Sequence, residues 1–251
     1  MAKKRVDQIL VERGLAQSRS RAQAYIMAGV VFSGEKKIEK SGQQLNQDVA
    51  LEVRGKQHPW VSRGGLKLVQ AIEEFDLNLT DLTVIDVGAS TGGFTDVCLF
   101  HGAKKVYAID VGHGQLAWKI RQDPRVIVLE KTNARYLTAQ EIPETVNMIV
   151  CDASFIGLQT VLPAAMARAA ENCILVALIK PQFEVGKANV GKGGVVRDPE
   201  LHIQVCQKIE KWINDDMEGW NVIGLTTSPI KGPQGNIEFL IGAKYEPKTD
   251  N

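Results

Sequence analysis

The chain has 251 residues, of which 44% are hydrophobic and 24% charged, a balance that is ordinary for a soluble globular protein of one or two domains. Its net charge of +1 conceals an asymmetry, because residues 1–60 carry +5 and the remainder −4, which hints at a polyanionic partner. The four cysteines form no CxxC pair and the four histidines show no paired helical spacing, which argues against disulfides and against a metal site.

The first sixty residues predict a small α+β domain. Apolar residues with helical spacing predict a helix that ends at Gly14, and Ser18 can cap a second helix that ends at Gly29. The apolar "VVF", a turn at "SGEKK" and the alternating "DVALEV" then predict short strands. We place this domain at residues 1–53 and interpret the polar stretch 54–59 as a linker.

From Trp60 onward, helices alternate with apolar strands. A first helix is expected near 63–75, strands near 82–88, 103–110, 126–131, 146–151 and 173–180, and intervening helices around 93–101, 115–121 and 159–170. This series of βαβ units predicts a doubly wound α/β sheet with parallel strands.

The C-terminal part departs from this alternation. A helix at 198–217 is followed by two apolar segments, "WNVIGLTTS" and "NIEFLIGAKY", which only seven residues separate. So short a link cannot hold a parallel crossover, and this last pair of strands is therefore expected to be antiparallel. The sheet domain then spans 60–245 and leaves a polar tail at 246–251.

The first two strands of the sheet end in features that suit a nucleotide. "DVGASTGGFTD", 86–96, is a glycine-rich turn between a strand and a helix, which lets the backbone approach a ligand closely. The next strand ends at Asp110, where a carboxylate can accept hydrogen bonds from ribose hydroxyls. Together these features indicate an adenosine cofactor without specifying which one.

Four further polar residues are expected at the same edge of the sheet. Asp152 and Lys180 end two parallel strands, and Glu238 begins the antiparallel one. Lys67 lies in the first turn of the helix that enters the domain. Each could singly be a solvated or capping side chain, but their coincidence at the edge where α/β sheets bind ligands indicates catalysis.

Several motifs resemble known families. "RVDQILVERGLAQSRSRAQAYIMAGVVFSG" resembles the small RNA-binding domain named after ribosomal protein S-four. "VSRGGLKL", "DVGASTGGFTD", "DASF", "LIKPQFE" and "NIEFL" resemble the TlyA family, and the likeness spans nearly the whole chain. That family is similar to the FtsJ-type ribose methyltransferases, which implies a Rossmann-like class I methyltransferase sheet and S-adenosylmethionine as methyl donor.

The resemblance also implies a reaction and its residues. The catalytic Lys-Asp-Lys-Glu set of the family falls on Lys67, Asp152, Lys180 and Glu238. Family members methylate 2′-hydroxyls of cytidines in ribosomal RNA, so ribosomal RNA or a ribosomal subunit is the expected partner.

Residues expected to bind the donor come from the strand ends. Gly88, Ser90 and Gly92 should line the methionine side, Asp110 should contact the ribose hydroxyls, and Asn133 the adenine edge. Two carboxylates, Asp86 and Asp152, are expected near the sulfonium or its amino group, where negative charge is favourable.

Lys180 is expected to contact the 2′-hydroxyl, in one of two roles. Adjacent carboxylates favour its charged form, whereas burial and a second lysine oppose it. It can therefore serve as a neutral base, or as an ammonium that only orients the oxygen while water takes the proton.

Basic residues in the N-terminal domain and around the sheet edge are expected to contact RNA. They are Lys3, Lys4, Arg5, Arg19, Arg21, Lys36, Lys37, Arg63, Lys187 and Lys192.

Three other functions compete with RNA methylation. A membrane-active haemolysin, suggested by another name of the family, would need a spanning or insertion segment. The most apolar long stretch, 161–179, contains Arg168 and Glu171, and the N-terminus lacks the apolar core of a signal peptide. The second is a nonenzymatic RNA-binding assembly factor, against which donor binding would argue. The third is a small-molecule methyltransferase, against which RNA-dependent turnover would argue. We expect a cytoplasmic enzyme with no membrane partner.

Overall fold

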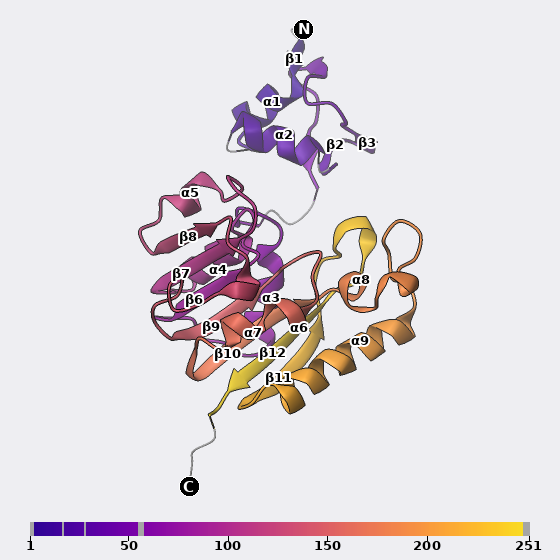
Figure 1. The fold of residues 1–251 in the computed structure, drawn as a ribbon. Coiled ribbons are helices and arrows are strands. Elements are labelled where there is room, and N and C mark those ends of the chain that lie inside the picture. Colours follow the sequence, from indigo (N-terminus) through magenta and orange to yellow (C-terminus); the bar gives the residue numbers. More distant parts are fainter. Residues whose placement is uncertain (1–2, 17, 28, 55–57, 248–251) are drawn as a thin grey trace. The chain divides into compact units, whose positions relative to one another are not determined.

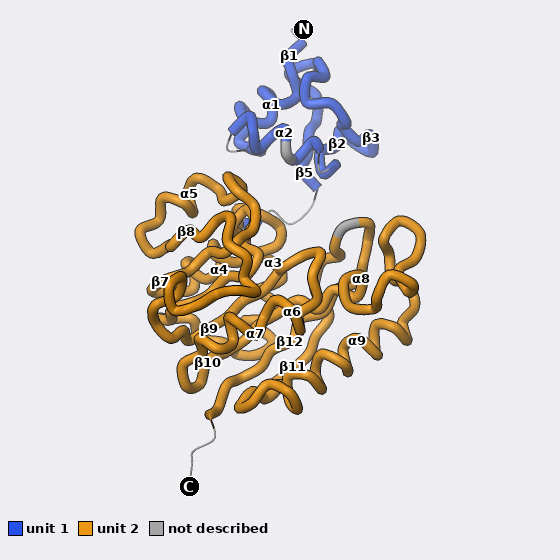
Figure 2. Tube along the Cα trace, in the orientation of Figure 1, with its two compact units in different colours: residues 1–58 blue, residues 59–251 orange. Residues whose placement is uncertain are grey.

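The computed structural model describes residues 3–16, 18–27, 29–54 and 58–247. The chain divides into two compact units, residues 1–58 and residues 59–251 (Figure 1, Figure 2). Residues 55–57 of the expected linker and 248–251 of the expected tail lie outside the described residues.

In its described residues, unit 1 contains two helices and short antiparallel strands around a small apolar core. Its elements are β1 (Lys3–Arg5), α1 (Val6–Glu12), α2 (Arg19–Met27), β2 (Val31–Ser33), β3 (Lys36–Lys37), β4 (Gln44–Asn46) and β5 (Glu52–Val53). Strand β1 pairs with β4, and β2 lies between β3 and β5. The core is formed by Val6, Leu10, Ala22, Ile26 and Val31.

Two expectations for unit 1 were wrong in detail. The strand expected over "DVALEV" is confined to β5, because β2 offers partners only to Glu52 and Val53. Lys36 and Lys37, expected in a turn, form β3 against Ser33 and Phe32.

Unit 2 is built on a seven-stranded sheet in the order β11-β12-β10-β9-β6-β7-β8. The strands are β6 (Thr83–Val87), β7 (Lys105–Asp110), β8 (Val126–Glu130), β9 (Val146–Cys151), β10 (Ala169–Ile179), β11 (Trp220–Thr227) and β12 (Phe239–Tyr245). Six strands run in one direction, and β12, which lies between β10 and β11, runs antiparallel to both. The expected α/β sheet with an antiparallel last pair is thus confirmed.

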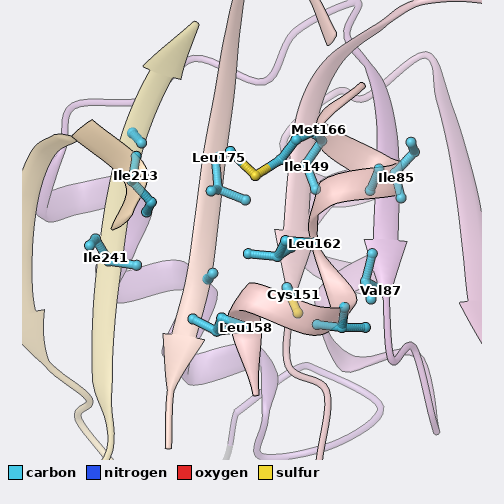
Figure 3. Packing of buried hydrophobic residues seen from close by; sticks show 14 of the residues in the cluster. Ile85, Val87, Ile149, Cys151, Leu158, Leu162, Met166, Leu175, Ile213 and Ile241 are labelled. Carbon is cyan, nitrogen blue, oxygen red and sulfur yellow. The ribbon is translucent and has the colours of Figure 1, made fainter. Parts of the chain in front are cut away.

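Helices cover both faces of this sheet. They are α3 (Gly65–Glu74), α4 (Gly93–Phe100), α5 (Trp118–Arg121), α6 (Leu158–Val161), α7 (Pro163–Met166), α8 (Pro181–Glu184) and α9 (Pro199–Lys211), which continues as a π-helix over Trp212–Asp216. On one face α6, α7 and α9 pack on buried residues of the strands. Figure 3 shows Leu158, Leu162 and Met166 of the α6–α7 segment and Ile213 of the π-helix in this layer. On the other face, α3, α4 and α5 pack on the alternate strand residues, so the central strand β6 is buried on both sides, whereas the edge strand β11 keeps an exposed face.

The connection between β9 and β10 differs from the expected single helix at 159–170. Pro163 has no backbone N–H and is favoured at the start of a helix, and here it opens α7 directly after α6. Strand β10 already begins at Ala169, which pairs with Val146. The register then shifts, and the pairing with β9 resumes at Ile174. The helix expected at 115–121 is also shorter, and forms only α5.

The four cysteines are all buried and unpaired. Among the described residues no helix is both long enough and apolar enough to cross a membrane.

Candidate active site

The sheet register brings the lysines and carboxylates of the strand ends together. Asp152 directly follows β9 and Lys180 directly follows β10. Because Ile179 pairs with Phe239 in the antiparallel ladder, Lys180 and Glu238 leave the sheet side by side. Lys67 reaches the same place from the first turn of α3.

Lys180 is held by three oxygen atoms. Its Nζ lies 2.6 Å from Asp152 Oδ1 and donates to the Asp152 carbonyl at 3.0 Å and to Ser154 Oγ at 2.9 Å. Three acceptors match the three N–H bonds of an ammonium group. Sequence reasoning missed Ser154, although it lies within the "DASF" motif two residues after Asp152.

Lys67 joins the two carboxylates. Its Nζ is 3.2 Å from Asp152 Oδ2 and 2.8 Å from Glu238 Oε2. The side chain of Lys67 is only 8% exposed and that of Glu238 is fully buried, so this pairing is screened little by solvent. The four residues therefore form one continuous chain of charge-assisted contacts, from Lys180 through Asp152 and Lys67 to Glu238.

This charged chain lines a cavity of about 230 Å³. The first turn after β6 contributes Gly88 and Ser90 to its wall. At Gly88 the backbone has a positive φ of 82°, and a Cβ there would lie 2.9 Å from the Ala153 backbone, so the close approach of the two strand ends requires glycine.

A second cavity, of about 590 Å³, adjoins the first and shares Gly88, Ser90, Asp152 and Ser154 with it. Asp110 and Asn133 line this larger cavity, as does the exposed ring of Phe155.

Asp110 shapes the wall of the larger cavity. Its Oδ2 accepts from the Ser90 N–H at 2.8 Å and its Oδ1 from the Gly112 N–H at 2.7 Å, so it ties the turns after β6 and β7 together. Each carboxylate oxygen keeps lone-pair capacity for a further donor, as a ribose hydroxyl would supply. Asn133 Oδ1 accepts from the Arg135 N–H and starts the following 3₁₀ turn.

The structure does not bring Asp86 to either cavity, contrary to expectation. Asp86 is fully buried, and its Oδ2 accepts from the Thr95 N–H at 3.0 Å and from Thr95 Oγ1 at 2.6 Å. Burial, helped by the nearby charges of Asp152 and Asp110 and opposed by the hydrogen bonds from Thr95, raises the pKa of Asp86 to about 7. Asp86 lies inside β6 rather than after it. Its hydrogen bonds with Thr95 hold α4 against the sheet.

Gly92 is also absent from the walls of both cavities. Its φ is 93°, and a Cβ there would lie 2.9 Å from a Leu116 methyl group and 3.3 Å from Ile120. The glycine therefore allows the close packing of the turn against Leu116 and α5.

The basic residues expected to contact RNA differ in how firmly they are held. In unit 1, Arg5 and Arg19 pair with the buried Asp7, and hydrogen bonding to Arg5 holds the pKa of that carboxyl well below its usual range. Lys4 pairs with Glu12, and the Arg21 guanidinium lies over the Tyr25 ring.

The remaining basic residues are more exposed. Lys3, Lys36 and Lys37 of unit 1 and Arg63, Lys187 and Lys192 of unit 2 are all exposed. Arg63 donates to the Lys231 carbonyl at 3.2 Å.

The chain is similar to known proteins in both units. The FtsJ-like methyltransferase family matches residues 60–245 and the S4 domain matches residues 4–49. The chain is 47% identical to the 16S/23S rRNA (cytidine-2′-O)-methyltransferase TlyA of Mycobacterium tuberculosis over 238 residues, 94% of this chain and 88% of that protein. It is 40% identical to Hemolysin A of Brachyspira hyodysenteriae over 240 residues, 94% of this chain and 98% of that protein. A solved structure of a Streptococcus thermophilus protein that bears the name hemolysin matches with a TM-score of 0.76 at 40% identity, and covers 100% of this chain and 92% of the other.

Proposed function

Because the chain belongs to the FtsJ-like methyltransferase family and carries an S4 domain, we propose that it methylates the 2′-hydroxyl of a cytidine in ribosomal RNA, with S-adenosylmethionine as donor. The expected likeness to the TlyA family is confirmed by the identity to the mycobacterial enzyme, whose name specifies this reaction. The observation that carries the proposal is the chain of contacts from Lys180 to Glu238, which lines the smaller of two adjoining cavities.

The larger cavity suits the donor. Asp110 would accept from its ribose hydroxyls, Asn133 would face the adenine edge, and Gly88 and Ser90 would lie along the methionine part. S-adenosylmethionine, when bound, supplies a methyl group on a positively charged sulfur. The carboxylate of Asp152, which lines both cavities, favours positive charge at their junction.

The smaller cavity would receive the ribose 2′-hydroxyl. Methyl transfer needs the oxygen aligned with the methyl carbon and its proton removed. Two of the three oxygens around Lys180 Nζ, both on Asp152, can only accept hydrogen bonds, so Lys180 would keep these two contacts and orient the substrate hydroxyl in place of Ser154 Oγ. Water would then take the proton, and Lys67 and Glu238 would hold Asp152 and Lys180 in place.

We propose unit 1 as the RNA-binding domain and keep the division predicted from the sequence, with the domain at 1–53, a linker at 54–59 and the methyltransferase domain at 60–245, close to the boundary of the two compact units after residue 58. The exposed lysines Lys3, Lys36 and Lys37 would contact phosphates, whose neutralisation makes binding depend on salt. An enzyme that acts on ribosomal RNA works where ribosomes are assembled, so we place it in the cytoplasm.

The test is transfer of labelled methyl from S-adenosylmethionine to purified ribosomal RNAs and ribosomal subunits, with the modified nucleotide mapped. Lys180→Ala should abolish transfer and leave donor affinity unchanged, whereas Lys208→Ala, the same change on the exposed face of α9, should leave both unchanged. Full activity of Lys180→Ala would overturn the catalytic assignment. Donor binding without methylation of any RNA or subunit would overturn the assignment of ribosomal RNA as the substrate.

A further inference from the structure

A third cavity, of about 340 Å³, opens beside the charged chain of the active site. It shares Ser154 and Glu238 with the smaller catalytic cavity, so a nucleotide whose ribose lies there can place its base here. Phe155 and Phe183 form an apolar part of its wall, with ring centroids 5.2 Å apart. The first turn of α8 adds a polar group to this wall, the Gln182 side chain.

The orientation of the Gln182 amide is fixed by the catalytic carboxylate. Its Nε2 donates to Glu238 Oε1 at 3.4 Å, while Glu238 Oε2 is bound to Lys67 at 2.8 Å. The carboxylate lies so close to Gly232 that a Cβ at that position would be 2.2 Å from Oε1, so this placement of Glu238 requires the glycine. Turning the amide over would place two acceptor oxygens against each other, so the nitrogen must face Glu238.

This constraint leaves the other end of the amide without a partner. Gln182 Oε1 is buried and accepts no hydrogen bond from any residue that the structure describes. A buried acceptor that has lost its water and gained no donor is unfavourable, and a ligand that brings an N–H to it removes that cost.

We propose that Gln182 Oε1 accepts a hydrogen bond from the exocyclic 4-amino group of the target cytosine, and so selects cytidine over uridine. Cytosine carries a donor at this position whereas uracil carries a carbonyl acceptor, which would repel Oε1. The inference rests on the proposed function, because it needs an RNA ribose in the catalytic cavity. Gln182 would then bind two groups at once: its Nε2 donates to Glu238, and its Oε1 accepts from the base.

The experiment compares three RNA substrates that differ only at the methylated position: cytidine, uridine, and the 2-pyrimidinone nucleoside that lacks the 4-amino group. Wild-type protein should methylate cytidine roughly 10- to 100-fold more efficiently, by kcat/KM, than either analogue. Gln182→Met keeps the length of the side chain but has no acceptor oxygen, and should bring cytidine and 2-pyrimidinone to equal efficiency. Gln207→Met, the same change on the exposed face of α9, should keep the wild-type ratio.

The outcomes separate this inference from the proposed function. Equal wild-type rates on cytidine and 2-pyrimidinone would overturn it without any variant, so a folding defect of Gln182→Met cannot protect it. An unchanged ratio in a folded, donor-binding Gln182→Met would overturn it too, although RNA methylation itself would stand. No methylation of any substrate by wild-type protein would overturn the proposed function and the inference together.

Discussion

The buried pairing of Lys67 with Glu238 gives a quantitative test of the site through stability. Lys67→Met removes the cation and leaves the fully buried Glu238 carboxylate, among the residues that the structure describes, with only the long contact from Gln182. Breaking a buried ion pair by removing one partner typically costs about 3–5 kcal/mol, because the remaining charge is desolvated without compensation. We expect a value near the lower end, about 3 kcal/mol, since the adjoining cavity of about 230 Å³ can admit water.

The assay is urea unfolding followed by tryptophan fluorescence. All four tryptophans, Trp60, Trp118, Trp212 and Trp220, belong to unit 2, so the signal reports the unit that contains the site. Tryptophan fluorescence thereby avoids mixing the two units in one transition.

Two matched variants make the test specific. Lys105→Met breaks a pair of similar length, 2.6 Å to Glu144, but both side chains are about a third exposed, so it should cost less than about 1 kcal/mol. The double variant Lys67→Met with Glu238→Gln removes both charges and should recover most of the lost stability. A Lys67→Met protein within about 1 kcal/mol of wild type, or a double variant as unstable as the single one, would refute the burial argument.

Three further predictions follow from the site and from unit 1. Burial raises the pKa of Asp86 to about 7 from 3.8, so the folded state binds the proton more tightly and unit 2 should lose stability as pH rises from about 4 to 7. Asp86→Asn should therefore be about 2–4 kcal/mol more stable than wild type at pH 8 and equal to it near pH 4 by urea unfolding, and a difference independent of pH would contradict this. Asp110→Ala removes the carboxylate that holds the Ser90 turn and should weaken S-adenosylmethionine binding by at least about tenfold in calorimetry, whereas unchanged affinity would remove Asp110 from the donor pocket. Replacing both Lys36 and Lys37 by alanine should make the slope of log RNA affinity against log salt shallower by about 1.4 without changing donor affinity, and an unaltered slope would argue against phosphate contacts there.

Much of the sheet could be predicted from the sequence because hydrophobic periodicity and link length are local properties. Seven residues between the last two apolar segments are too few for a crossover, and the pair is indeed antiparallel. From the antiparallel pairing we predict that Glu238 lies at the same edge of the sheet as Lys180. The observed strand register places the two residues side by side.

Errors arose where a shift of one or two residues changes the outcome. Asp86 and Asp152 both follow apolar runs, but Asp86 is the fourth residue of β6 and Asp152 lies just beyond β9. Asp86 pairs with Val150 inside the ladder and is covered by α4, whereas Asp152 lies beyond Cys151, the last residue of β9, and reaches the cavity. Strand ends are the least certain feature of a sequence pattern, and the two carboxylates could not be separated by it.

The sequence by itself determined the order of the strands along the chain, the antiparallel last pair and the edge at which Lys180, Asp152 and Glu238 emerge. Only the tertiary structure decided which side chains meet there. Ser154 contacts Lys180, which is 26 residues away in the chain, and Gln182 contacts Glu238, which is 56 residues away. No local sequence pattern marks such contacts. The physical reason is that periodicity fixes the face on which a residue lies, whereas hydrogen-bond partners depend on how separate elements pack and turn toward one another.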